Sequence, residues 1–134
     1  MEDFVRMHGL SSVVTFHGAL NDQALIDKLR AAHVLVVPSS YEGFGIVYLE
    51  GMGFGLPAIG TTAGAASEVI EAGVTGFLIQ PGDAQGLAGQ LQLLSERRDI
   101  LLEMSLAARS RYLRQPKWSQ TAGRIREFLL SFLG

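Results

Sequence analysis

Two glutamates and two glycines lie close together in the segment Glu42–Glu50, which reads E-G-F-G-I-V-Y-L-E. Gly43 and Gly45 flank Phe44 at the point where a helix is expected to begin. Glycine lets the backbone approach a ligand closely, and the N-terminus of a helix attracts anions. We therefore expect the backbone N–H groups of Phe44, Gly45 and Ile46 to face an anionic ligand such as a phosphate.

The two carboxylates of this segment have no basic neighbour, because no Lys or Arg occurs from Glu42 to Gly60. Glu50 stands among apolar residues, and a buried carboxylate needs hydrogen-bond donors. Protein N–H groups, water or sugar hydroxyls could supply them. Two simpler interpretations stay open: glycine pairs often serve only packing, and a glutamate on an apolar helix often faces solvent.

The elements around this segment alternate between strand and helix patterns. Four short runs of apolar residues predict strands. They are residues 13–17, 34–37, 58–61 and 76–79. The alternation predicts an α/β fold with a parallel sheet flanked by helices, in which ligands bind beyond the carboxyl ends of the strands.

Helix boundaries are marked by capping residues and prolines. Asn21 is a plausible N-cap for a helix that ends near Ala32, and Asp83 for a helix that follows the fourth strand. Pro38 should end the second strand. Pro116 should separate the last two helices, the second of which begins at about residue 118.

Composition limits the classes of protein and site. The 134 residues suit one domain, and 48% hydrophobic against 18% charged residues predicts a folded protein. A net charge of −2 without charge runs argues against nucleic-acid or anionic-membrane binding. The absence of cysteine suits a reducing cytoplasm. No metal-ligand spacing is present, so we expect no metal.

The segment resembles the donor-binding signature of retaining GT-B glycosyltransferases, a family marked by two glutamates separated by seven residues. Glu42 and Glu50 have this spacing, and the similarity continues through G-L-P-A-I-G-T-T-A-G, S-E-V-I and G-V-T-G-F-L-I-Q-P-G-D. The resemblance implies a Rossmann-like fold corresponding to an incomplete C-terminal half of GT-B. It also implies one partial domain over residues 1–134, with a core at about 13–97, helices at 98–134 and no N-terminal acceptor domain.

The resemblance also implies roles for individual residues. Glu50 would accept hydrogen bonds from the donor ribose, and Glu42, as the catalytic residue, would lie near the transferred sugar. Gly18 and Ala19 would border the base. Glu68 matches an acidic position beside the site, although a solvent-facing or capping role fits it equally. Thr75 stands where the family often has Asn, a change expected to affect only turn geometry.

The function implied is transfer of a hexosyl group, with retention of configuration, from a UDP-, GDP- or ADP-sugar to a glycan, lipid or small-molecule acceptor. The family implies no cofactor, and a location in the cytoplasm or at the inner face of the membrane for the full-length enzyme. We expect the chain alone to be inactive, since the acceptor domain and basic residues that neutralise the diphosphate lie outside it. The main alternative is a non-catalytic nucleotide or sugar-phosphate binding module.

Two apolar segments predict contacts beyond the core. Residues 13–17 are expected to pair beside residues 34–37 or with another copy of the chain, because an exposed strand edge invites pairing. The last helix carries Phe128, Leu129, Leu130, Phe132 and Leu133, too many for one narrow core-facing stripe. Both features predict self-association.

Overall fold

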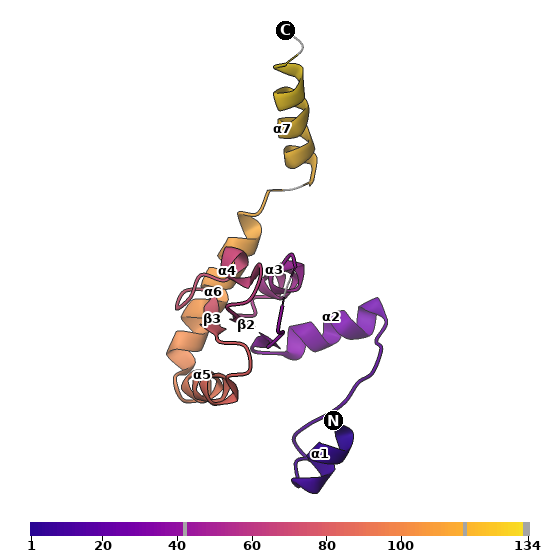
Figure 1. The fold of residues 1–134 in the computed structure, drawn as a ribbon, viewed down its shortest axis with the longest axis vertical. Coiled ribbons are helices and arrows are strands. Elements are labelled where there is room, and N and C mark those ends of the chain that lie inside the picture. The colour runs from indigo at the N-terminus through magenta and orange to yellow at the C-terminus, as the bar shows by residue number, and fades with distance from the viewer. Residues whose placement is uncertain (42, 117, 133–134) are drawn as a thin grey trace. The chain divides into compact units, whose positions relative to one another are not determined.

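The computed structural model describes residues 1–41, 43–116 and 118–132. They form two compact units, Met1–Ala31 and Ala32–Gly134, which are described separately. The expectation of a single domain stays a prediction. Figure 1 traces the chain through its helices and strands. In order these are α1 Glu2–Met7, α2 Asp22–Ala31, β1 Leu35–Val37, α3 Ile46–Gly53, β2 Ala58–Thr61, α4 Ala66–Val69, β3 Gly76–Ile79, α5 Ala84–Glu96, α6 Arg98–Leu113 and α7 Trp118–Leu130.

The larger unit contains a parallel sheet with strand order β1-β2-β3. Leu35 pairs with Ala58 on one side of β2, and Ala58 pairs with Gly76 on the other. The order and direction confirm the predicted α/β class. They also bring the carboxyl ends of all three strands to one edge of the sheet.

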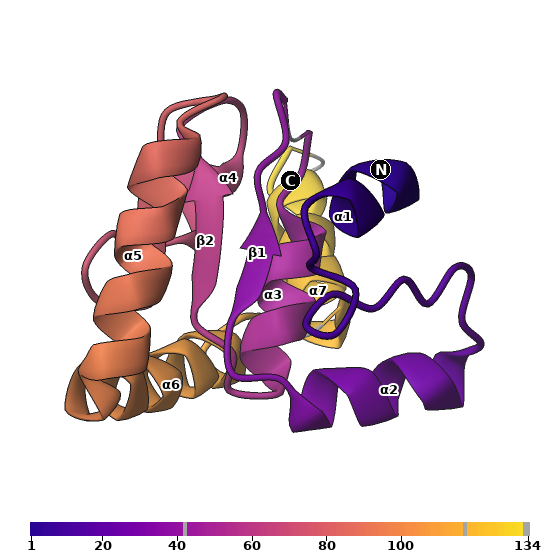
Figure 2. The same ribbon diagram turned by 90° about the horizontal axis from the view of Figure 1, so that it is seen from below.

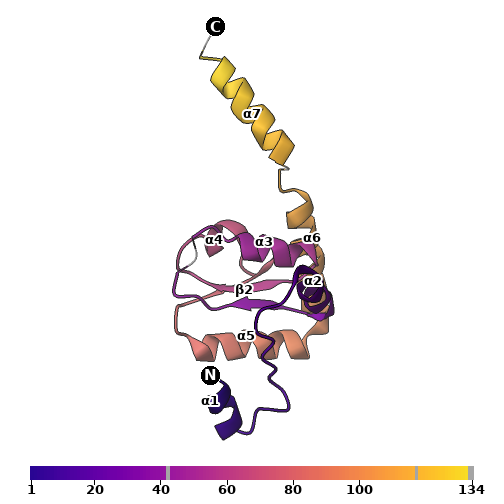
Figure 3. The same ribbon diagram turned by 90° about the vertical axis from the view of Figure 1, so that its right-hand side faces the viewer.

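Helices cover both faces of this sheet, with α3 and α4 on one face and α5 on the other (Figure 3). Successive residues of β2 point to opposite faces. Ala58 accordingly joins a cluster with Tyr48, Met52 and residues of α4, whereas Ile59 joins a cluster with Leu94 of α5. Helix α6 contributes to both clusters, so it holds the two layers together.

The predicted helix boundaries are confirmed by their caps. The backbone N–H of Ala24 donates to Asn21 Oδ1 over 2.9 Å, and that of Gly86 donates to Asp83 Oδ1 over 2.8 Å. Strand β1 ends at Val37, immediately before Pro38, and α6 ends at Leu113, three residues before Pro116. Local sequence therefore defined these ends.

The predicted strand at residues 13–17 is wrong. The N–H groups of Val13 and Val14 both donate to the carbonyl oxygen of Leu10 over 3.0 Å, so the segment begins in a turn, and none of its residues is in a strand. Val13 is 75% exposed. Pairing of this segment beside β1 stays a prediction, because the two lie in different units; within the larger unit β1 pairs with β2. An apolar run becomes a strand only where a neighbouring strand accepts its hydrogen bonds.

Candidate functional site

The loop between β1 and α3, residues 38–45, lies at the carboxyl edge of the sheet; the structure describes it except for residue 42. In Figure 2 strands β1 and β2 run side by side with α3 beside them. Glu42, the predicted catalytic residue, lies outside the described residues. The predicted donor-binding residues Gly43, Phe44, Gly45, Ile46 and Glu50 lie in this loop or on the helix that it opens.

Gly45 is the residue that turns the chain into α3. It has φ +67° as the N-cap of the helix, a conformation that costs other residues about 1–2 kcal/mol. A Cβ atom here would lie 2.9 Å from Val69 Cγ2 and 3.3 Å from the carbonyl oxygen of Ala65. Gly45 therefore lets the start of α3 pack directly against α4, which is the packing role that the sequence had left open.

Gly43 and Phe44, which precede Gly45, are exposed to solvent. A Cβ atom at Gly43 would meet nothing within 4 Å, and Phe44 is 83% exposed. Ile46 is also exposed. An α-helix has no internal acceptor for the N–H groups of its first turn. The surface at the start of α3 therefore combines exposed residues with the positive end of a helix.

Glu50 lies one turn after Ile46, so both residues lie on the same face of α3. Its side chain is exposed. The sequence had left burial and exposure of this carboxylate open. The inward face of α3 is occupied by Tyr48 and Met52, which are both fully buried and each lie two residues from Glu50. Of the two interpretations, exposure to solvent is the one this chain adopts. The carboxylate is accessible to a ligand on the same face as the start of the helix.

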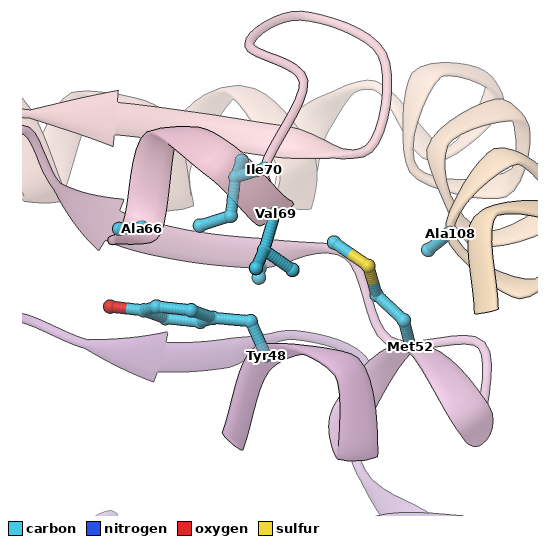
Figure 4. Packing of buried hydrophobic residues seen from close by; sticks show 7 residues of the cluster. Tyr48, Met52, Ala66, Val69, Ile70 and Ala108 are labelled. Atoms are coloured by element: carbon cyan, nitrogen blue, oxygen red, sulfur yellow. The ribbon is translucent and has the colours of Figure 1, made fainter. Parts of the chain in front are cut away.

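Tyr48 and Met52 fix α3 on the sheet, as Figure 4 shows with their partners Ala66, Val69, Ile70 and Ala108. Both side chains are fully buried, and the Tyr48 hydroxyl donates to the carbonyl oxygen of Val37 over 3.3 Å. Gly60 leaves the room for this ring, because a Cβ atom there would lie 2.8 Å from the Tyr48 hydroxyl oxygen. The helix that carries Glu50 is thus held by its opposite face.

Two threonines near the sheet are buried; the sequence singled out Thr75 for its turn but did not identify Thr61. The Thr61 hydroxyl donates to the carbonyl oxygen of Ser39 over 2.7 Å, and the Thr75 hydroxyl accepts from the N–H of Glu71 over 2.9 Å. Thr75 is confined to a structural role by this bond and by its full burial. Its backbone does not have positive φ; Gly73 takes that conformation in the turn instead. A polar residue directly at a strand end is the signal that could have found both.

The other three candidate residues, Glu68, Gly18 and Ala19, lie outside the β1–α3 loop and helix α3. Glu68 is exposed on α4, the short helix that packs against Gly45. Gly18 and Ala19 lie in an exposed loop of the smaller unit, where Gly18 has φ +61°.

Two pockets differ in their relation to the site. One of about 190 Å³ opens at the carboxyl edge of the sheet, where Pro38 and Ile79 meet the start of α5. A larger hollow of about 740 Å³ runs along α7 and is lined by residues of that helix alone. We place the candidate site at the sheet edge, because the α7 hollow is an exposed apolar helix face without any of the candidate polar groups.

Among the described residues, every helix is too short or too polar to span a membrane.

Comparison with known proteins agrees with this geometry. Residues 1–111 match the family described as "Glycosyl transferases group 1". The chain is 35% identical, over 92% of its length, to a sucrose synthase of Acidithiobacillus caldus, of which it spans 18%.

Solved structures give the same result. Anabaena HepE in complex with UDP superposes with a TM-score of 0.87 at 28% identity, covering 97% of this chain and 35% of HepE. The C-terminal domain of a glycosyl transferase group 1 family protein from Francisella tularensis has a TM-score of 0.80 at 27% identity, covering 87% of this chain and 60% of that one. The chain thus spans about a third or less of the full-length relatives. With the glycine-capped helix at the carboxyl edge of a parallel sheet, these matches show that the chain belongs to the group 1 glycosyl transferases and has part of their GT-B fold.

Proposed function

We propose that this chain binds the nucleotide-diphosphate-sugar donor of a retaining hexosyltransferase. The observation that carries the proposal is the start of α3, where Gly45 caps the helix in a left-handed conformation at the carboxyl edge of the sheet. A diphosphate beside this helix end would interact favourably with the first-turn N–H groups, including that of Ile46. HepE, which binds UDP and UDP-glucose in its crystal structures, supports the choice of ligand.

Each candidate residue then has a defined role. Exposed Glu50 would accept hydrogen bonds from the ribose hydroxyls, and Glu42 would be the catalytic residue acting at the transferred sugar. Phe44, Gly45 and Ile46 would contact the diphosphate through their backbone N–H groups, and Glu68 would contribute at the margin. The assignment of Gly18 and Ala19, in the smaller unit, to the base stays a prediction. In the reaction, fixed backbone dipoles would stabilise the leaving diphosphate as an oxocarbenium-like transition state forms. No metal or cofactor is required.

Binding is tested by titrating the ¹⁵N-labelled chain with UDP, GDP, ADP and UDP-glucose. We expect one nucleotide to shift the backbone amides of residues 43–50, with weak affinity. Glu50→Gln should weaken binding roughly tenfold, because hydrogen bonds to charged groups contribute about 1.5–3 kcal/mol. Glu103→Gln, which changes an equally exposed carboxylate on α6, is the matched control. Amides 43–50 that do not respond to any of the four ligands would contradict the proposal.

We further propose that transfer requires more than this chain. The chain spans 18% of the sucrose synthase and 35% of HepE, and under this proposal the acceptor site and further donor contacts lie outside the described residues. We therefore propose that the chain binds its donor without transferring the sugar to a glycan, lipid or small-molecule acceptor, and that it works with an N-terminal domain in the cytoplasm. Incubation with a bound donor and a set of acceptors tests this, and sugar transfer by the chain alone would contradict it.

Helix α7 is the candidate surface for self-association. Ile125, Phe128, Leu129 and Leu130 are each more than half exposed, and water-exposed apolar clusters of this kind favour association. Sedimentation of the wild type should show species larger than a monomer, and Phe128→Asp should shift them towards the monomer. A wild-type chain that is monomeric at all concentrations would contradict this part of the proposal.

A further inference from the structure

Thr61, the last residue of β2, is one of two fully or almost fully buried polar side chains in the described part of the chain, the other being Thr75. Its hydroxyl donates to the carbonyl oxygen of Ser39 over 2.7 Å. This bond joins the central strand to the loop that leads to the glycine-capped helix. It links two segments that are 22 residues apart in the sequence.

The position of this bond is explained by the way the sheet ends. The ladder between β1 and β2 reaches Val37 and Gly60, and the next residue, Pro38, has no N–H to continue it. Ser39 lies one residue further along the loop, and the side chain of Thr61 supplies the donor that its carbonyl oxygen needs. A side chain thus extends the attachment of the loop by two residues beyond the strand.

The loop between β1 and α3 is attached to the core at both of its ends. Ser39 is held by Thr61 at the entry, and Gly45 packs against Val69 of α4 at the exit. Between these points Tyr41 is 75% exposed and Gly43 has open space around it. Ser39 and Gly45 are therefore two points at which contacts attach the described part of the loop to the core, one at each end.

We propose that the Thr61 hydroxyl is a positioning group for the donor site, acting through Ser39 to hold the loop against which the nucleotide diphosphate binds. The inference rests on the proposed function for the identity of the ligand. Thr61 itself does not touch the donor. Its bond fixes the approach of the chain to Gly43 and to the start of α3, so that less order has to be gained when the ligand binds.

Two substitutions separate positioning from simple packing. Thr61→Val keeps the shape of the side chain and removes the hydroxyl, whereas Thr61→Ser keeps the hydroxyl and removes a methyl group. A purely packing role predicts that the serine variant is the more damaged one. Thr62→Val is the matched control, because the neighbouring Thr62 hydroxyl bonds to Gln80 Oε1 over 3.2 Å, away from the loop.

Amide hydrogen exchange without ligand, together with UDP titration, tests the proposal. In Thr61→Val we expect exchange at residues 43–47 to rise at least about tenfold while exchange in α5 is unchanged, and UDP binding to weaken by roughly tenfold. Thr61→Ser and Thr62→Val should retain wild-type behaviour. Wild-type exchange and affinity in Thr61→Val, or an equal loss in Thr61→Ser, would overturn the inference.

Two further readouts keep the test decisive. If the wild type does not bind UDP, the proposed function fails, while the ligand-free exchange still decides whether Thr61 holds the loop. If Thr61→Val does not fold, the wild-type Ser39 carbonyl ¹³C shift provides the answer during the titration. We expect it to move together with the amides of residues 43–47, and an unchanged Ser39 shift on UDP binding would overturn the inference.

Discussion

Helices α3 and α7 are both rich in apolar residues, but α3 buries some of them, whereas the described ones of α7 are exposed. Tyr48 and Met52 of α3 are fully buried, whereas Phe128 and Leu129 of α7 are 63% and 58% exposed. The difference lies in what faces each helix. Gly60 makes room for the Tyr48 ring on the sheet, and Gly51 brings α3 so close to β1 that a Cβ atom there would lie 2.7 Å from Leu35 Cδ2. Apolar character makes burial favourable, but close approach of a complementary surface decides whether it occurs.

The largest difference between the two helices is expected from truncating the buried Met52 of α3 and the exposed Leu129 of α7. Met52→Ala should lower the free energy of unfolding by about 2–5 kcal/mol, because it removes buried contacts and leaves a cavity. Leu129→Ala should change it by about 0.5 kcal/mol or less. Urea unfolding followed by circular dichroism measures both. Equal losses would mean that α7 packs into a core in solution.

The next largest effect is expected at the glycine cap of α3. Gly45→Ala should destabilise the chain by about 2–4 kcal/mol, from left-handed strain together with crowding against Val69 and Ala65. Gly43→Ala should cost about 0.5 kcal/mol or less, because its surroundings are open. Chemical unfolding of the two variants provides the comparison. A tolerated alanine at residue 45 would contradict the packing role assigned to this glycine.

Replacing a glycine in α7 by alanine should increase stability, in contrast to the same replacement at Gly45. Gly123 lies inside this helix, and an added Cβ atom would meet nothing within 4 Å. Gly123→Ala should therefore increase helix content and stabilise α7 by up to about 1 kcal/mol, the difference in helix propensity between the two residues. Thermal melting followed at 222 nm measures it. A loss of stability would indicate that another surface lies close against residue 123.

The smallest effect concerns an exposed ion pair at the start of α6. The hydrogen bond from Arg97 lowers the pKa of Asp99 from 3.8 to about 2. A lowered carboxylate pKa gives stability that is present above the unfolded value and is lost as the pH falls from about 4 towards 2. In Arg97→Gln the Asp99 carboxyl ¹³C titration should move back up towards its ordinary range. An unchanged midpoint would exclude Arg97 as the cause, and because both groups are exposed the change in stability should be slight.

Local sequence predicted the elements whose signals depend on neighbouring residues. Asn21 and Asp83 cap helices because their side chains reach N–H groups three residues ahead, and Pro38 ends a strand because it lacks a donor. The three strands that pair were also predicted, since apolar runs bounded by breakers suit a buried parallel sheet. The strand predicted at residues 13–17 was wrong because an apolar run alone does not make a strand: in the described residues no strand pairs with it.

The candidate site divides in the same way. Sequence alone determined that a glycine-rich turn precedes a helix at the end of a strand, and that Glu50 follows without a basic neighbour. Only the tertiary structure decided that Glu50 faces outward, that Gly45 is required by contact with α4, and that Thr61 reaches Ser39 across 22 residues of chain. Caps and turns depend on residues that are close together in the sequence, so the sequence predicts them. Exposure, close approach and long-range hydrogen bonds depend on which surfaces meet, and that is determined only when the whole chain packs.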